Sequence, residues 1–136
     1  MSGAGYSGTP LPKKLGIKED ARVALVGAPP EAAALIEPLP PGVVLRSWLR
    51  GEADVIVFFT RQRGVLEQRL DALVAKLACD GSLWVAWPKR ASGVETDMTE
   101  NVVREVALPR GLVDTKVCAI SDVWSGLRLV RRLANR

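Results

Sequence analysis

The chain has 136 residues, of which 48% are hydrophobic and 25% are charged, as in one soluble globular domain with a real core. No apolar run reaches the roughly 18 residues of a membrane span, and the N-terminus lacks the basic start and apolar centre of a secretory signal. We therefore expect a cytoplasmic protein with no membrane contact. The net charge of +4 permits weak attraction to nucleic acid or to acidic partners but requires neither.

The chain contains no histidine. Histidine is the commonest general base and a frequent zinc ligand, so its absence removes Ser-His-Asp and Cys-His catalytic sets and most zinc sites. The two cysteines, Cys79 and Cys118, lack a CxxC spacing and are expected to be buried small hydrophobes in a reducing compartment. We predict no catalytic residues and no metal ligands.

The first part of the chain predicts an arm followed by short elements. Residues 1–12 are rich in Gly, Ser and Pro and are expected to form an N-terminal arm, with Tyr6 as its candidate anchor. A single domain is expected over residues 13–136. Its first elements are about one helical turn at 12–17, a strand at 23–26 and a short helix at 30–37 that Pro38 ends.

The middle of the chain alternates strands and helices. A second strand is predicted at 43–48, and residues 53–60 predict a strand buried on both faces, because their β-branched and aromatic side chains show no polar alternation. Leucines and valines at three- and four-residue spacing over residues 65–77 predict an amphipathic helix that ends near Gly81. Residues 83–87 predict the next strand.

The last third predicts a helix and a hairpin. After a polar loop at 89–96, Asp97 and Glu100 form a plausible capping pair for a helix from Met98 to about Leu108. Residues 112–120 and 124–132 predict two antiparallel strands joined by a short turn. Because the earlier strands alternate with helices, we expect an α/β fold of three layers, with a mainly parallel sheet to which the hairpin adds one reversed strand.

This order of elements over about residues 13–133 resembles the class I methyltransferases, a Rossmann-like branch that binds S-adenosylmethionine and ends in an antiparallel strand. The most specific local match is Asp80-Gly81 followed by the apolar residues 83–87. Residues 5–10, 84–89 and 124–132 also look like an uncharacterised bacterial family of small domains. That second resemblance implies no activity.

The chain departs from the methyltransferase pattern where the cofactor would bind. Gly27 follows the first strand, but Pro29 and Pro30 come next and have no N–H for a ligand. Methyltransferases carry an acid for the ribose hydroxyls at the end of the second strand, whereas residues 46–48 here are not acidic. Few residues separate that strand from the next, so one helix–strand unit is expected to be missing. We predict no cofactor and disfavour S-adenosylmethionine, which stays an alternative.

Ligands of open α/β sheets bind beyond the carboxyl ends of the strands. The candidate ligand-binding residues at that edge are Gly27, Lys89, Arg90, Ser92, Thr96 and Asp97. The cations and hydroxyls of this set suit a phosphate or a carboxylate. The structural alternative is that Lys89 and Arg90 are solvated, that Thr96 and Asp97 cap a helix, and that Gly93 permits a turn.

Three functions remain open. The first in rank is a non-catalytic, methyltransferase-like binding or regulatory module, whose partner is a protein or a small anionic ligand. The second is a small enzyme or sensor that binds a nucleotide-like or anionic ligand at the carboxyl ends of the strands.

The third function is a weak nucleic-acid-binding module, which we disfavour. Trp84 and Trp87 lie three apart on a strand and so face opposite sides, which rules out one stacking platform for bases. A basic patch would require both ends of the chain to share a face, so as to gather Lys13, Lys14, Lys18, Arg128, Arg131, Arg132 and Arg136.

Overall fold

The computed structural model describes residues 9–47 and 49–135. Six strands form one sheet in the order β2-β1-β3-β4-β6-β5. Neighbouring strands from β2 to β4 are parallel, whereas β6 runs antiparallel to both β4 and β5. The strands are β1 (Arg22–Val26), β2 (Val44–Arg46), β3 (Ala53–Phe59), β4 (Leu77–Pro88), β5 (Leu112–Ala119) and β6 (Trp124–Arg131). The predicted mainly parallel sheet with one reversed strand is confirmed.

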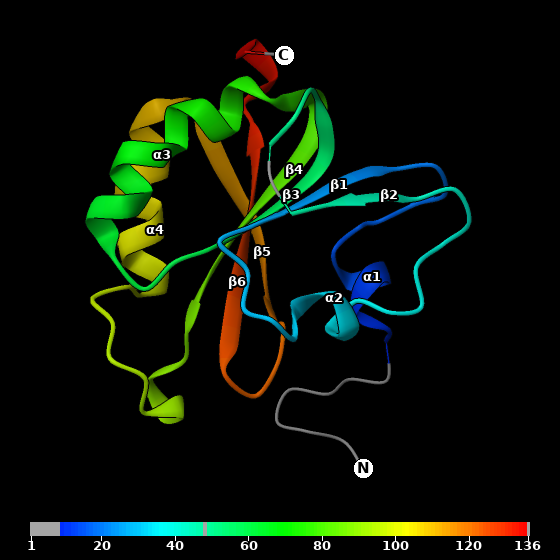
Figure 1. Cartoon of the computed structure of the whole chain (residues 1–136). Coiled ribbons are helices and arrows are strands. Elements are labelled where there is room, and N and C mark those ends of the chain that lie inside the picture. Colours follow the sequence, from blue (N-terminus) through cyan, green and yellow to red (C-terminus); the bar gives the residue numbers. More distant parts are fainter. Residues whose placement is uncertain (1–8, 48, 136) are drawn as a thin grey trace.

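Helices cover both faces of the sheet, which gives the three predicted layers (Figure 1). On one face lie α1 (Leu11–Lys14) and α2 (Ala32–Leu35), and on the other α3 (Arg63–Ala75) and α4 (Glu100–Ala107) lie side by side. Most of the predicted N-terminal arm, including Tyr6, lies outside the described residues. No described helix is both long and apolar enough to cross a bilayer.

Strand β3 is buried on both sides, as its unbroken apolar run predicts. Ile56 and Phe58 belong to the core under α3 and α4, whereas Val57 belongs to the core under α1 and α2. In β4, Trp87 lies in the first core and Trp84 in the second, where its indole N–H donates to the Leu15 carbonyl at 3.1 Å. The two tryptophans therefore pack on opposite faces and do not form one platform for bases.

Two connections near the start of the sheet are short. Helix α2 has only four residues, and several prolines follow it before β2. The chain then passes from Arg46 at the end of β2 to Ala53 at the start of β3, and its described residues contain no helix there. This arrangement agrees with the predicted loss of one helix–strand unit.

The predicted end of the long helix near Gly81 is wrong. Helix α3 ends at Ala75, and the chain enters β4 at Leu77. Residues 78–81 then bulge opposite Asp54, where the register between β3 and β4 shifts. Gly81 serves this bulge, because a Cβ there would lie 2.8 Å from the Asp54 carbonyl oxygen. The glycine is thus required for close strand packing and does not end the helix.

The same bulge changes the environment of one cysteine. Cys79 is exposed, so the prediction that it is buried is wrong, whereas Cys118 is half-buried on β5. Burial raises the pKa of the Cys118 thiol, which favours its neutral form.

Arg22 and Asp54 tie the start of β1 to the start of β3. The Asp54 carboxylate accepts hydrogen bonds from the Arg22 backbone N–H at 2.8 Å and from the guanidinium Nε and Nη2 at 3.1 and 3.0 Å. The side-chain hydrogen bond from Arg22 holds the pKa of the Asp54 carboxyl below its usual range.

The bulge predicts that Gly81→Ala lowers the free energy of unfolding by about 1–3 kcal/mol, because the new methyl group meets backbone atoms that cannot move away. Gly64→Ala in α3 is the matched control, since a Cβ at Gly64 meets no atom within 4 Å and alanine favours the helix. Urea denaturation of both variants measures the effect. Equal stabilities of Gly81→Ala and the wild type would contradict the account of the bulge.

The lowered pKa of Asp54 predicts an acid-dependent contribution to stability. This contribution is complete above the unfolded-state pKa of about 3.9 and is lost as the pH falls from there toward the folded-state pKa. The wild type should therefore exceed Asp54→Asn in unfolding free energy at neutral pH, and the difference should shrink below about pH 4. Urea denaturation between pH 7 and about pH 3 checks this, with the exposed Asp80→Asn as control. A difference that stays constant over this range would contradict the prediction.

Candidate functional site

The carboxyl ends of β1, β3 and β4 meet at one edge of the sheet, because these strands are parallel. The start of β6 lies at the same edge, where Trp124 pairs with Pro88 at the end of β4. The loop between β4 and α4 runs over this edge and contains a short 3-10 turn at Arg90–Ser92. The site is thus built from three strand ends, the start of a fourth and one long loop.

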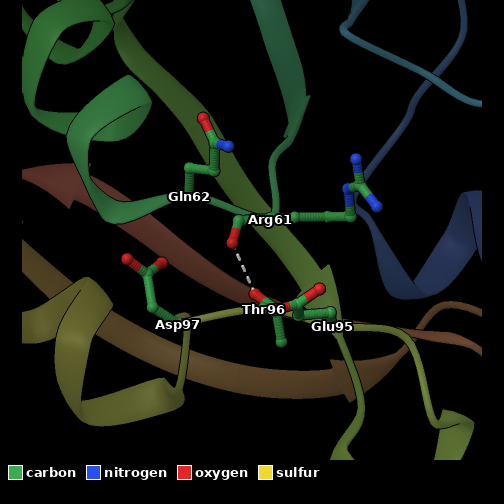
Figure 2. A pocket seen from close by; sticks show the side chains of 5 residues that line it. All are labelled: Arg61, Gln62, Glu95, Thr96 and Asp97. Atoms are coloured by element: carbon green, nitrogen blue, oxygen red, sulfur yellow. Dashed lines mark hydrogen bonds between the residues drawn. The ribbon is translucent and has the colours of Figure 1, made fainter.

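The loop is fastened to the connection between β3 and α3. The Thr96 hydroxyl donates to the Arg61 carbonyl at 2.6 Å (Figure 2), and the Asp97 carboxylate accepts from the Arg63 backbone N–H at 2.8 Å. Gln62, which precedes α3, makes no capping bond with its own side chain. Asp97 therefore caps α3 from a distant part of the chain.

The fastened segment has a hollow on each side, and Glu95 and Thr96 line both. The first hollow has a volume of about 400 Å³ and is also lined by Arg61, Gln62 and Asp97. Figure 2 shows that the Arg61 side chain points away from Asp97. The second hollow has a volume of about 580 Å³ and lies between the end of β4, the start of β6 and the start of α4.

The structure brings some of the candidate residues together. Lys89, Arg90 and Thr96 line the second hollow, and Thr96 and Asp97 line the first. Ser92 lines neither hollow. Its hydroxyl donates to the Lys89 carbonyl at 2.6 Å and accepts from the Val94 N–H at 3.2 Å, so it closes the turn of the loop.

Gly27 also lies outside both hollows. Its φ of +68° favours glycine, and a Cβ at this position would lie only 2.8 Å from the Phe59 carbonyl oxygen. The turn after β1 is therefore packed against the end of β3. Gly27 is required for this contact between two backbones, which is a structural role.

The structural alternative accounts for three of the loop side chains. Ser92, Thr96 and Asp97 all make hydrogen bonds that hold the loop, and Gly93 ends the 3-10 turn. The predicted capping pair of Asp97 with Glu100 is wrong, because the cap of α4 is Thr99, whose hydroxyl accepts from the Val102 N–H at 3.1 Å.

Sequence reasoning missed several residues that line the second hollow. The sequence predicts Met98, Thr99 and Glu100 only at a helix start, Trp87 only in a strand and Ser125 only in the hairpin. The predicted reversal of the last strand could have placed Ser125 at this edge, because an antiparallel strand begins beside the end of the strand it pairs with.

The order of elements and the sheet topology give a Rossmann-like fold of the methyltransferase type. The chain belongs to the family described as Protein of unknown function (DUF3052), whose model matches residues 45–133. The resemblance to an uncharacterised family is thereby confirmed. No curated protein matches the chain by sequence.

Solved methyltransferase structures share the fold at low sequence identity. A SAM-dependent methyltransferase from Aquifex aeolicus is 14% identical with a TM-score of 0.63, and the match covers 86% of this chain and 85% of that one. Ribosomal protein L11 methylase from Lactobacillus delbrueckii subsp. bulgaricus is 13% identical with a TM-score of 0.59, over 90% and 75% of the two chains. TrmN from Thermus thermophilus is 12% identical with a TM-score of 0.56, and the match covers 90% of this chain and 47% of that one. These likenesses establish the fold alone.

S-adenosylmethionine is the cofactor that this fold implies, and the residues present do not fit it. The turn after β1 packs against Phe59, and two of its positions are prolines without an N–H. At the end of β2 stands Arg46, whose guanidinium donates to the Arg50 carbonyl. A guanidinium has no acceptor, so it cannot take hydrogen bonds from ribose hydroxyls as a carboxylate does.

The basic residues considered for nucleic acid gather only in part: Lys18 and Arg128 line one hollow, whereas Lys13, Lys14 and Arg131 lie elsewhere. Arg131 donates to the carbonyls of Val74 and Ala78, next to the end of α3. Lys13 and Lys14 lie on α1, well away from the C-terminal end of the chain (Figure 1). Arg136 lies outside the described residues. Among the described residues, no three acidic or cysteine side chains gather closely enough to hold a metal ion.

The contact of Asp97 with α3 predicts that Asp97→Ala lowers the free energy of unfolding by about 1 kcal/mol, the usual cost of a lost helix cap. Glu95→Ala removes the same charge from the same loop without removing a side-chain hydrogen bond to any described residue, and should change stability by less than about 0.5 kcal/mol. Thermal or urea unfolding of the two variants compares them. Equal losses would mean that charge, and not capping, is responsible.

Proposed function

We propose that this chain is a non-catalytic, methyltransferase-like binding module that receives its ligand at the carboxyl edge of the sheet without S-adenosylmethionine. The observation that carries the proposal is the packing of the turn after β1 against β3. A Cβ at Gly27 would lie 2.8 Å from the Phe59 carbonyl oxygen, so Gly27 is committed to packing against the backbone of β3.

The chemistry of the turn supports this proposal. Nucleotide-like cofactors are held by successive backbone N–H groups at the start of a helix. Here Pro29 and Pro30 supply none, and the helix that follows, α2, is only four residues long. Such a short helix presents little dipole to a ligand.

The charges at the edge also oppose this cofactor. S-adenosylmethionine carries a sulfonium cation, which needs neutral or acidic surroundings. Arg46 is the last residue of β2 and Arg61 follows β3, so cationic residues stand at the carboxyl ends of two parallel strands. These cations favour an anionic ligand.

The carboxylates at the edge are poorly placed for acid–base catalysis. Asp97 is committed to the Arg63 N–H, and Glu95 is exposed on the loop. A general base needs burial or a charged neighbour that brings its pKa near the working pH. A binding or regulatory role therefore suits these residues better than catalysis.

Isothermal titration calorimetry with S-adenosylmethionine and with S-adenosylhomocysteine tests the proposal. We expect no saturable heat at ligand concentrations up to about 1 mM, because Pro29 and Pro30 remove two N–H donors from the turn that would hold either molecule. An active methyltransferase titrated with the same ligand stocks is the control. A dissociation constant of about 10 μM or below for either ligand would overturn the proposal.

A further inference from the structure

We propose that the second hollow binds a small organic anion, with a phosphate or carboxylate group at Lys89 and Arg90 and an apolar body against Trp87 and Met98. This inference rests on the proposed function and names the class of ligand that the edge of the sheet would take. The hollow lies between the end of β4, the start of β6 and the start of α4.

The inner wall of the hollow is apolar. Trp87 and Met98 are only 6% and 3% exposed, so they present fixed edges from the core, and Pro88 and Val94 extend the same wall. A rigid apolar wall can contact the body of a ligand without losing side-chain freedom on binding.

The rim of the hollow carries hydrogen-bond donors that the protein itself does not use. Among the described residues, Lys89 and Arg90 have no ion-pair partner, and the Ser125 hydroxyl has no hydrogen bond. The Thr99 hydroxyl oxygen accepts from the Val102 N–H, which leaves its hydrogen free to donate. Two cations and two hydroxyls are the donors that an oxyanion requires.

The remaining charges in the hollow leave it positive. Glu95 and Glu100 also line it, but Glu100 forms an ion pair with Arg104 of α4. One unpaired carboxylate therefore faces two unpaired cations. This balance favours an anion over a cation or a neutral molecule.

The loop that carries the cations is held in place before any ligand arrives. The Lys89 N–H donates to the Val123 carbonyl at 2.7 Å, and the Ser92 hydroxyl donates to the Lys89 carbonyl at 2.6 Å. The far end of the loop is fastened through Thr96 and Asp97. A loop fixed at both ends loses little entropy on binding.

Phenyl phosphate is the probe, because it joins an oxyanion to a flat apolar group. The full chain, labelled with ¹⁵N, is titrated in separate samples with phenyl phosphate, inorganic phosphate and phenol, and the NMR shifts of the Trp87 indole N–H and of the Arg90 and Ser125 amides are followed. We expect saturable shifts with phenyl phosphate, and binding at least about tenfold tighter than for either fragment.

Variants locate the binding. Lys89→Ala/Arg90→Ala should weaken phenyl phosphate binding by about tenfold or more, with no loss of thermal stability beyond that of an ordinary surface change. Lys13→Ala/Lys76→Ala removes two exposed cations from elsewhere and should leave binding unchanged. These paired results would support the inference.

Three results would overturn the inference: no saturable shift up to about 20 mM phenyl phosphate, equal weakening in both double variants, or inorganic phosphate binding as tightly as phenyl phosphate. None of these results would contradict the proposal that the chain does not bind S-adenosylmethionine at the turn after β1. That proposal is contradicted only if S-adenosylmethionine or S-adenosylhomocysteine binds. The two proposals can therefore fail separately.

Discussion

The backbone of Gly27 lies against the carbonyl of Phe59, and only glycine leaves room for this contact. The contact fixes where the chain leaves β1 and turns the following residues toward the neighbouring strand. Two prolines then remove the N–H groups that would face a ligand, and α2 is too short to supply a helix start of any length. The methyltransferase-like fold is built on two cores, one under α3 and α4 and the other under α1 and α2, while the turn after β1 packs against β3.

The loop between β4 and α4 runs over the carboxyl edge of the sheet and lines the second hollow. Its polar side chains divide into two kinds. Ser92, Thr96 and Asp97 hydrogen bond to backbone groups and hold the loop in shape, whereas Lys89 and Arg90 have no ion-pair partner among the described residues. The side chains that stabilise the loop are thus separate from the two cations that we propose as ligand-binding residues.

The elements that depend on local pattern could be predicted from the sequence, and those that depend on distant partners could not. The apolar run of β3 and the final hairpin predicted both the layers and the one reversed strand. Asp80-Gly81 has the local pattern of a helix end, but pairing with β3 extends the chain through these residues. Asp97 has the spacing of a cap for the next helix, yet its partner is Arg63, 34 residues earlier in the chain. The local sequence does not show which strand a residue pairs with or which distant helix it caps. The predicted helix end near Gly81 and the predicted capping role of Asp97 were wrong for this reason.

We propose that this methyltransferase-like domain binds a ligand without methyl transfer, because the turn after β1 packs on β3. The most direct measurement follows the backbone amides of Gly27 and Ala28 by NMR while S-adenosylhomocysteine is added to the full chain. Our account predicts that neither amide shifts, because Gly27 is packed on Phe59 and the prolines beyond it offer no donor. Saturable shifts of both amides, together with changes at Arg46, would show that the turn still grips an adenosyl ligand and would contradict the account.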